Sequence, residues 1–459
     1  MKSTVRTSCV LFLALFLAGI SFTSARAASI SLIAQIPIPG WNITVNPTPP
    51  PNLLTNASFD LLSFDPNRQI MYSADRPNQA VDVIDTKTNT LLGMIHVPNQ
   101  SGGAQNPSGV QVNPDLKQLV VTDRGTGAAG GGVYIYDLTA SAMPSAPVKT
   151  LLLPNAKATD ELNYDPVNKR VYVNNTNNTG DALGRYFMTV VDVNPASATF
   201  GQSLGQIPVA SGANSPEQPR FSPLDCTATP GTGCIYTTTG GNSTLLRINP
   251  NFALDPTNPA NNVGAIIKTI DLPGRSPAGF DVNTAGTLGL LGCNPGAPNG
   301  AAQELINLTT DSIVRFIPGI TATDVLAFDP SLNEWFTASQ NFVVSNGCPQ
   351  AQNTGIPATP NPQFPQVGGI LENPNPGLQT ACSGQGAHGL GVDPIHNFIY
   401  VPVGIFPANA TGITGIAAAP FAGILVFQAT AIPEPSSLLL MAFGLIFVFT
   451  YGYRRSVQK

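Results

Sequence analysis

Charge is scarce in this 459-residue chain, because only 10% of its residues are Asp, Glu, Lys or Arg, against about 25% in ordinary globular domains. No stripe of basic residues runs along the sequence, which argues against nucleic-acid binding. No CxxC or CxxCH spacing occurs, so neither a structural zinc site nor covalent haem attachment is indicated. No GxSxG, HExxH or phosphate-binding loop stands in a supporting context.

Glycine and proline are abundant instead, with 44 and 43 residues, and 42% of the chain is hydrophobic. This combination predicts many turns around a real core rather than disorder. Without three basic residues near each terminus, 15 of the 21 Lys and Arg remain, and without Glu434, 25 of the 26 acidic residues remain. The body between the terminal segments therefore carries about ten negative charges.

The N-terminus has the three parts of a secretory signal peptide. Lys2 and Arg6 form a basic start, Cys9–Ile20 is apolar, and Ala25-Arg26-Ala27 is a small-x-small cleavage site. We expect cleavage after Ala27; an uncleaved anchor helix is the alternative. Residues 1–27 are therefore assigned to the signal peptide, and the chain is predicted to be exported.

The C-terminus holds a second targeting segment, assigned to residues 431–459. Its apolar run, Ser436–Tyr453, has 18 residues, which at about 1.5 Å per helical residue is just enough to cross a bilayer core. The basic residues after it favour a cytoplasmic end. The segment contains Pro433, Glu434 and Pro435 before the apolar run, and Arg454 and Arg455 after it.

This order of Pro-Glu-Pro, one span and a short basic tail resembles the PEP-CTERM sorting signal of Gram-negative bacteria. The resemblance implies recognition by an exosortase at the inner membrane, followed by processing that releases the protein to the cell surface or extracellular matrix. It implies an address and no activity.

Residues 28–430 repeat a unit of four short β-strands. The unit reads most clearly from Phe59 to Pro98, where strands rich in β-branched residues alternate with polar turns. A phrase that ends the first strand recurs seven times, at Phe64-Asp65-Pro66, Val112-Asn113-Pro114, Tyr164-Asp165-Pro166, Phe221-Ser222-Pro223, Val282-Asn283-Thr284, Phe328-Asp329-Pro330 and Val392-Asp393-Pro394. The sixth unit is least clear beyond Ala338.

Four-stranded units at this period predict an all-β fold, a seven-bladed β-propeller; a long β-solenoid is the alternative. The seventh unit lacks a fourth strand before the sorting tail. The segment Leu32–Pro39 resembles the fourth strand Leu92–Pro98 of the first unit. We therefore expect Ile33–Ile38 to pair with Gly423–Gln428 and close the ring, which would remove the exposed sheet edges.

The repeats also resemble the YVTN-type propeller repeats of bacterial surface proteins. The resemblance rests on Arg170–Asn175, Ala80–Thr86 and Pro107–Val110, and it fades after the third unit. It implies a propeller scaffold, related in shape to lactonases and to cytochrome d1 haem domains, and no single activity.

Five cysteines remain after removal of the signal peptide. Cys226 and Cys234 flank a turn-rich segment, and we expect them to form a disulfide, which an exported protein can keep. Cys348–Cys382 and Cys293–Cys348 are both open as further pairs.

A polar column is expected where the inner strands begin, at the mouth of the central channel. It reads Asp60, Ser108, Asp160, Glu217, Ala278, Asp324 and His388. Convergent oxygen ligands suit Ca²⁺ or Mg²⁺, so the expected metal ligands are Asp60, Asp160, Glu217, Asp324 and His388, with Glu161 as a general base on metal-activated water. Alternatively, these side chains cap strand ends or lie in solvent.

Two functions follow from these observations. The first is an exported surface or matrix propeller that acts as a binding or structural protein, with exopolysaccharide or surface proteins as partners. The second is a metal-dependent hydrolase, similar to lactonases in its broad layout, although the gluconolactonase-type motif is not clearly present. A haem-bearing redox propeller has no ligand motif to support it.

Overall fold

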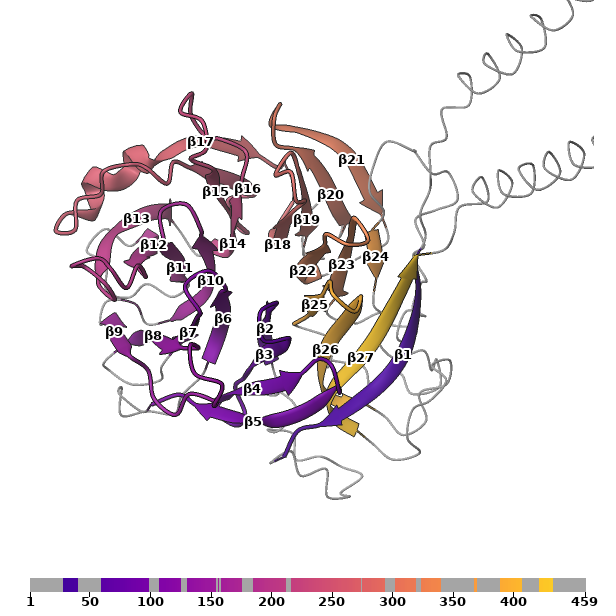
Figure 1. The fold of residues 1–459 in the computed structure, drawn as a ribbon. Helices are drawn as coiled ribbons and strands as arrows, with labels where there is room; N and C mark the ends of the chain where they lie inside the picture. The colour runs from indigo at the N-terminus through magenta and orange to yellow at the C-terminus, as the bar shows by residue number, and fades with distance from the viewer. Residues whose placement is uncertain are drawn as a thin grey trace, which may run out of the picture.

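Short sheets arranged like spokes around a common centre make up the chain, which forms a β-propeller (Figure 1). The structure is a computed structural model. It describes residues 28–39, 59–98, 107–124, 130–153, 156, 158–175, 185–211, 216–273, 275–293, 302–318, 323–339, 367–369, 389–406 and 421–431. The predicted signal peptide, most of the sorting tail, His388, Cys348 and Cys382 lie outside these residues.

Six sheets are complete four-stranded antiparallel blades, and each is built mainly from consecutive strands. The first two are β2 Phe59–Asp65, β3 Ile70–Asp75, β4 Ala80–Asp85, β5 Thr90–His96, and β6 Pro107–Asn113, β7 Gln118–Asp123, β8 Gly131–Asp137, β9 Lys149–Leu153. The next two are β10 Thr159–Asp165, β11 Arg170–Asn175, β12 Arg185–Asp192, β13 Ser203–Ser211, and β14 Pro216–Ser222, β15 Cys234–Thr239, β16 Thr244–Ile248, β17 Ile266–Asp271, with the 3₁₀ helix η1 Pro259–Ala265 before β17. The others are β18 Pro277–Val282, β19 Leu288–Cys293, β20 Ala302–Asn307, β21 Ser312–Pro318, and the closing sheet of β25 Gly391–Asp393, β26 Phe398–Phe406, β27 Phe421–Ala431 and β1 Ala28–Pro37.

The structure thus shows six complete blades among its described residues, one fewer than the seven expected. A further sheet has three strands, β22 Thr323–Asp329, β23 Glu334–Ser339 and β24 Val367–Gly369. Its third strand runs parallel to β23, whereas a hairpin would have made it antiparallel. Parallel neighbours need a long connection, and residues 340–366 separate these two strands.

The ring closes through the two ends of the described chain. Each inner strand contacts the next in the order β2, β6, β10, β14, β18, β22 and β25, and β25 contacts β2. Figure 1 shows β1 beside β27, although they come from opposite ends of the sequence. Their pairing is antiparallel, with Ile36 opposite Ile424 and a bulge between Leu32 and Ala34. The predicted closure by an N-terminal strand is confirmed.

Apolar side chains fill the spaces between neighbouring sheets. Strand β3 is buried along its whole length, whereas the outer strand β17 is mostly exposed. Between the third and fourth blades, for example, Met188 and Val190 pack with Ile235 and Leu246. Because an alternating strand has two faces, the inner strands of each sheet contribute side chains to the cores on both sides. Packing between sheets therefore holds the ring together.

The recurring Asp-Pro phrase stabilises the turn between the first and second strands of a blade. In the third blade, Asp165 is fully buried and its Oδ1 accepts hydrogen bonds from the N–H groups of Val167 at 2.9 Å and Asn168 at 3.1 Å. Lys169 then takes a left-handed φ of 55° before β11 begins. Asp65, Asp329 and Asp393 use an Oδ1 in the same way. The repeated phrase therefore reports hairpin geometry rather than chemistry.

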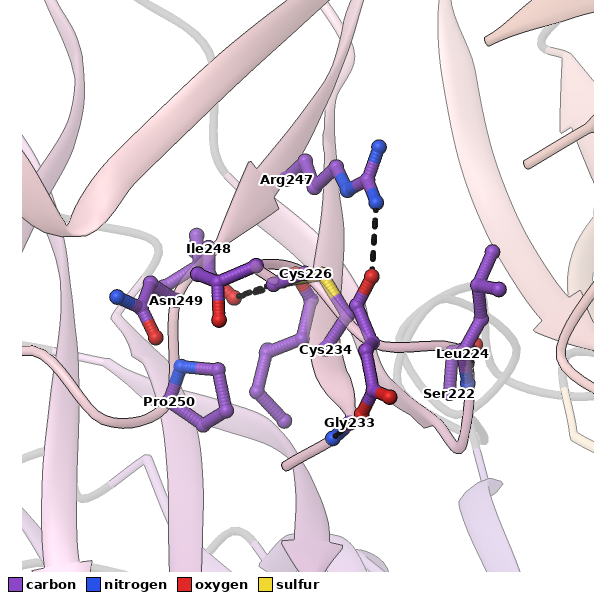
Figure 2. The surroundings of a disulfide bond; sticks show 12 residues. Ser222, Leu224, Cys226, Gly233, Cys234, Arg247, Ile248, Asn249 and Pro250 are labelled. Atoms are coloured by element: carbon purple, nitrogen blue, oxygen red, sulfur yellow. Dashed lines mark hydrogen bonds between the residues drawn. A yellow bond between two sulfur atoms is a disulfide. The ribbon is translucent and has the colours of Figure 1, made fainter. Parts of the chain in front are cut away.

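The predicted disulfide between Cys226 and Cys234 is present, with 4.9 Å between the two Cα atoms (Figure 2). It closes the turn before β15, where Asp225 Oδ1 accepts hydrogen bonds from the N–H groups of Thr232 and Gly233. Cys293 is buried and free, and the other two cysteines of the open pairings, Cys348 and Cys382, lie outside the described residues. No helix within the described residues is long and apolar enough to cross a membrane.

Replacing Asp165 with alanine should lower the free energy of unfolding by about 1–3 kcal/mol, because two turn N–H groups and the Asn168 amide lose their acceptor. Asp165→Asn should cost less, since it keeps Oδ1 and the Asn168 amide can rotate. Urea unfolding followed by circular dichroism would compare the two. Equal losses would show that the acceptor is not the cause.

Removing the disulfide in Cys226→Ala/Cys234→Ala should lower stability by about 2–3 kcal/mol, because the short loop no longer restricts the unfolded chain. The control is Ala228→Ser, an exposed change in the same loop. Unfolding midpoints, together with mass-spectrometric mapping of the linked peptide in the unchanged protein, would check this. A double variant as stable as the control would contradict it.

Candidate functional site

Two carboxylates from different blades meet at the centre of the ring. Asp60 lies near the start of the inner strand β2, and Asp160 lies near the start of the inner strand β10. Their residues are only 2% and 1% exposed. Because inner strands run side by side around the centre, equivalent positions on them converge at one end of the channel. The structure thus places both side chains, which the sequence analysis put in one column, within reach of the same arginine.

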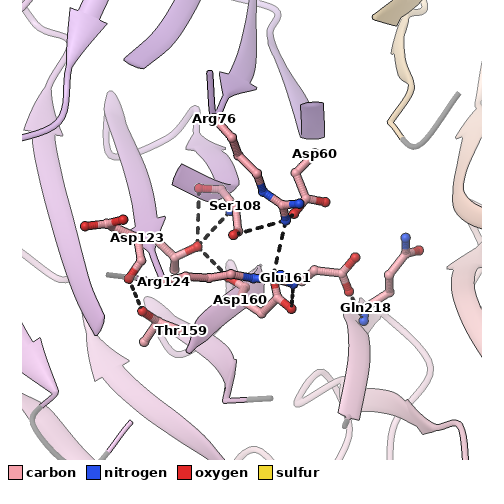
Figure 3. Close-up of polar contacts among 11 residues, drawn as sticks. Asp60, Arg76, Ser108, Asp123, Arg124, Thr159, Asp160, Glu161 and Gln218 are labelled. Atoms are coloured by element: carbon pink, nitrogen blue, oxygen red, sulfur yellow. Dashed lines mark hydrogen bonds and ion pairs between the residues drawn. The ribbon is translucent and has the colours of Figure 1, made fainter. Parts of the chain in front are cut away.

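Two arginines neutralise these carboxylates (Figure 3). Arg76 follows β3, forms an ion pair with Asp60, donates to Ser108 Oγ at 3.2 Å, and has a guanidinium nitrogen 3.9 Å from Asp160 Oδ1. Arg124 follows β7 and holds Asp160 with both Nε, at 3.0 Å from Oδ1, and a terminal nitrogen. This two-pronged geometry is the strongest form of arginine–carboxylate pairing. One network therefore links the first three blades.

The two arginines supply the positive charge that the sequence analysis expected a metal ion to supply. Two guanidinium groups take up the oxygens of Asp60 and Asp160 that would have faced Ca²⁺ or Mg²⁺. Among the described residues, no three His, Cys, Asp or Glu side chains are placed to hold a metal. The four described members of the predicted ligand set, Asp60, Asp160, Glu217 and Asp324, thus do not form the expected site.

Glu217 and Asp324 lie at the edge of the same network. Burial lowers the pKa of Arg124, but the charge of Asp160 and, more weakly, that of Glu217 outweigh it and raise that pKa. Burial and repulsion from Arg124 lower the pKa of Arg76 to about 10, against the opposing charges of Asp160 and Asp324. The fifth predicted ligand, His388, lies outside the described residues.

Glu161 is a structural acid rather than a base facing water. Its residue is 4% exposed, and one carboxyl oxygen accepts a hydrogen bond from the N–H of Gln218 in the next blade. Burial, followed by the charges of Asp160 and Asp324, raises the pKa of Glu161 to about 8. The carboxyl is therefore buried and bonded to the backbone of the next blade, whereas the expected general base would face water.

Gln218 of the fourth blade forms hydrogen bonds with three other inner strands. Its Nε2 donates to the carbonyl oxygen of Asp324 at 2.6 Å, and its Oε1 accepts from the N–H of Phe280 at 3.0 Å. Its φ of 37° is unusual for a residue other than glycine. With the bond to Glu161, this residue joins four consecutive inner strands.

Further along the inner strands, side chains of one blade accept backbone N–H groups of the next. Ser63 Oγ accepts from Val112 at 2.9 Å, and Asn163 Oδ1 accepts from Phe221 at 2.7 Å. Asp281 Oδ2 accepts from Phe328 at 2.6 Å, while its Oδ1 takes the guanidinium of Arg220 at 3.0 Å. These contacts satisfy edge groups that inner strands cannot pair with another strand.

The sequence analysis missed both arginines. A signal for them exists: an Asp-Arg pair ends the second strand of the first unit at Asp75-Arg76 and that of the second unit at Asp123-Arg124. These are equivalent positions in the repeat, so opposite charges were available at the same end as the carboxylate column. Side-chain reach, which sequence spacing does not report, decided that they meet.

Replacing Glu161 with glutamine should flatten the dependence of stability on pH. The unfolded carboxyl loses its proton near pH 4.5, whereas the folded one keeps it to about pH 8, so the protein loses stability as pH rises through this window. Glu161→Gln keeps an oxygen for Gln218 and should recover about 1–4 kcal/mol at pH 8.5 relative to pH 4.5. Unfolding midpoints across this range, with Glu217→Gln as control, would show it; an unchanged slope would contradict it.

Three comparisons with known proteins add to this geometry. The PEP-CTERM protein-sorting motif matches residues 431–455. No curated protein shows significant similarity to the chain. Among solved structures, a hydrazine synthase from Kuenenia stuttgartiensis is similar with a TM-score of 0.45 and 13% identity, over 61% of this chain and 80% of that one. The chain thus carries a PEP-CTERM sorting motif behind a β-propeller.

Proposed function

We propose that this protein is exported, sorted by its PEP-CTERM motif, and presented at the cell surface or in the extracellular matrix as a binding or structural propeller. The observation that carries the proposal is the sorting motif at residues 431–455, which directly follows the propeller. In this proposal, an exosortase at the inner membrane recognises the motif while the segment Ser436–Tyr453 spans the bilayer.

The closing sheet supports this division of the chain into residues 1–27, 28–430 and 431–459. Its outer pair extends from Ala28 opposite Ala431 to Pro37 opposite Gly423. The predicted signal cleavage after Ala27 and processing near Pro433 would both fall just outside this pair. Removing the two targeting segments would therefore leave the seam of the ring intact.

Binding fits this molecule better than catalysis. The carboxylates that the hydrolase alternative would use are held by Arg76 and Arg124, and Glu161 is engaged by a backbone N–H. The exported body carries few charges, and most of them are negative, which favours neutral exopolysaccharide or surface proteins over anionic polymers as partners.

Two finer assignments belong to the same proposal. We infer that the three-stranded sheet β22-β23-β24 occupies the place of the sixth of seven blades, since β22 contacts β18 on one side and β25 on the other. We also infer that the first three blades are YVTN-type repeats, on the strength of segments such as Arg170–Asn175.

Replacing both Pro433 and Glu434 with alanine should block processing, because the sorting enzyme loses the residues that define its motif. The variant should accumulate in the cell envelope at a higher mass, while the unchanged protein is found outside the inner membrane. Immunoblots of fractionated native cells would measure this. Ile432→Val, which leaves the triplet intact, is the control.

The variant should keep the propeller, because both residues lie beyond β27. Circular dichroism and protease resistance of the purified variant would check this. Normal release of the double variant would contradict the sorting proposal. If the unchanged protein is released but binds no extracellular polymer or surface protein, only the binding role is contradicted.

A further inference from the structure

The first blade contains a second group of buried acids, which begins at Asp75, the residue before Arg76. Asp75 ends β3, and Asp82 lies in β4; both residues are completely buried. In the antiparallel register Ser73 is opposite Asp82 and Ala80 is opposite Asp75. The two aspartates are therefore diagonal neighbours on one face of the sheet.

This face packs against the closing sheet. Met71 and Ile84, which share the face with the two acids, pack with Ile36 of β1, Tyr400 of β26 and Ile424 of β27. The acids thus lie in the interface between the first blade and the sheet in which the two ends of the chain meet.

Among the residues that the structure describes, none offers Asp82 a counter-charge. Both of its carboxyl oxygens and the hydroxyl of Ser73 are buried without a hydrogen-bond partner. Strands β1, β26 and β27 contain no Asp, Glu, Lys, Arg or His, and Met94 is the residue opposite Asp82 on β5.

Three other titratable groups lie on or beside this face. His96 on β5 is opposite Ala80, two residues beyond Met94, and its side chain is exposed. The Tyr400 hydroxyl donates to Asn89 at 2.6 Å, and Asp393, which ends β25, is paired with His396 at 2.7 Å. Asp75 is then the charged neighbour of Asp82 among the described residues.

A buried carboxylate without a donor is expensive, and a second carboxylate beside it adds repulsion. The arrangement is tolerable when the pair keeps one proton. Asp75 is the member that can be ionised, because its oxygens accept from the N–H of Asn78 at 3.1 Å and from its Nδ2 at 2.6 Å. Asp82 is the member that must be neutral.

Asn78 connects this pair to the seam. Its Nδ2 also donates to the carbonyl oxygen of Pro39 at 3.0 Å, just beyond the end of β1. We propose that a proton held between Asp75 and Asp82 latches the closing strand β1 onto the first blade, and that losing this proton loosens the seam.

The direction of the effect follows from linkage. Burial, followed by the charge of Asp75, raises the pKa of Asp82 well above its usual range. An acid that keeps its proton only in the closed state stabilises that state at low pH and stops doing so as pH rises through the raised pKa. Between the open-state and closed-state pKa values, opening of the seam should increase up to about tenfold per pH unit.

The test uses the full propeller with Glu161→Gln as parent, which removes the buried acid whose pKa is raised to about 8. Hydrogen exchange by mass spectrometry, corrected for the intrinsic pH dependence of amide exchange, follows peptides covering β1 and β27 from pH 5 to 9. Unfolding midpoints are measured on the same samples. In the parent, exchange should rise and the midpoint should fall with pH.

Adding Asp82→Asn should make both measurements much less dependent on pH than in the parent, because an amide of the same shape needs no proton. Asp75→Asn is the second variant, since it removes the repulsion and should weaken the pH response even where Asp82→Asn folds poorly. Asn78→Ala should leave the pH dependence of the midpoint but abolish that of β1 exchange.

Two results would overturn the proposal. If Asp82→Asn and Asp75→Asn both keep the parent's pH dependence, the pair holds no proton. If the midpoint loses its pH dependence while β1 exchange in the parent never varied with pH, the proton stabilises the blade without latching the seam.

Discussion

The inner strands of a propeller impose one demand on the rest of the molecule: their inward N–H groups have no further strand to pair with. Here the side chains of the preceding blade meet part of that demand. Ser63, Asn163 and Asp281 each accept an N–H from the next blade, and Glu161 and Gln218 do the same near the channel mouth. Backbone satisfaction and blade-to-blade adhesion are therefore the same set of contacts.

The need for contacts between blades explains why a protein with so few charged residues buries several of them. At the centre, two carboxylates are paired with two guanidinium groups, those of Asp60, Asp160, Arg76 and Arg124. A buried charge left without its partner there would be destabilising. Such a network sets the relative positions of the first three blades. It also means that acidic side chains at a propeller centre need not indicate a metal, because arginines from the second-strand ends reach the same place.

Local sequence patterns anticipated much of the fold. The recurring turn phrase located the hairpins because a buried Asp side chain holds each turn, and the likeness of Leu32–Pro39 to an outer strand located the closure. The sixth unit resisted prediction after Ala338, since its third strand pairs in parallel across a long connection. Asp60 and Asp160 of the predicted carboxylate column lie together, but their partners were not predicted, because Arg76 and Arg124 come from other strands.

The sequence by itself determined the repeat, the hairpins, the disulfide between Cys226 and Cys234, and the address carried by residues 431–455. These depend on residues close together in the chain, where spacing is equivalent to geometry. Only the tertiary structure decided which charges neutralise one another and which acids keep a proton. Those outcomes depend on burial and on contacts between blades, and both arise when distant strands are brought face to face.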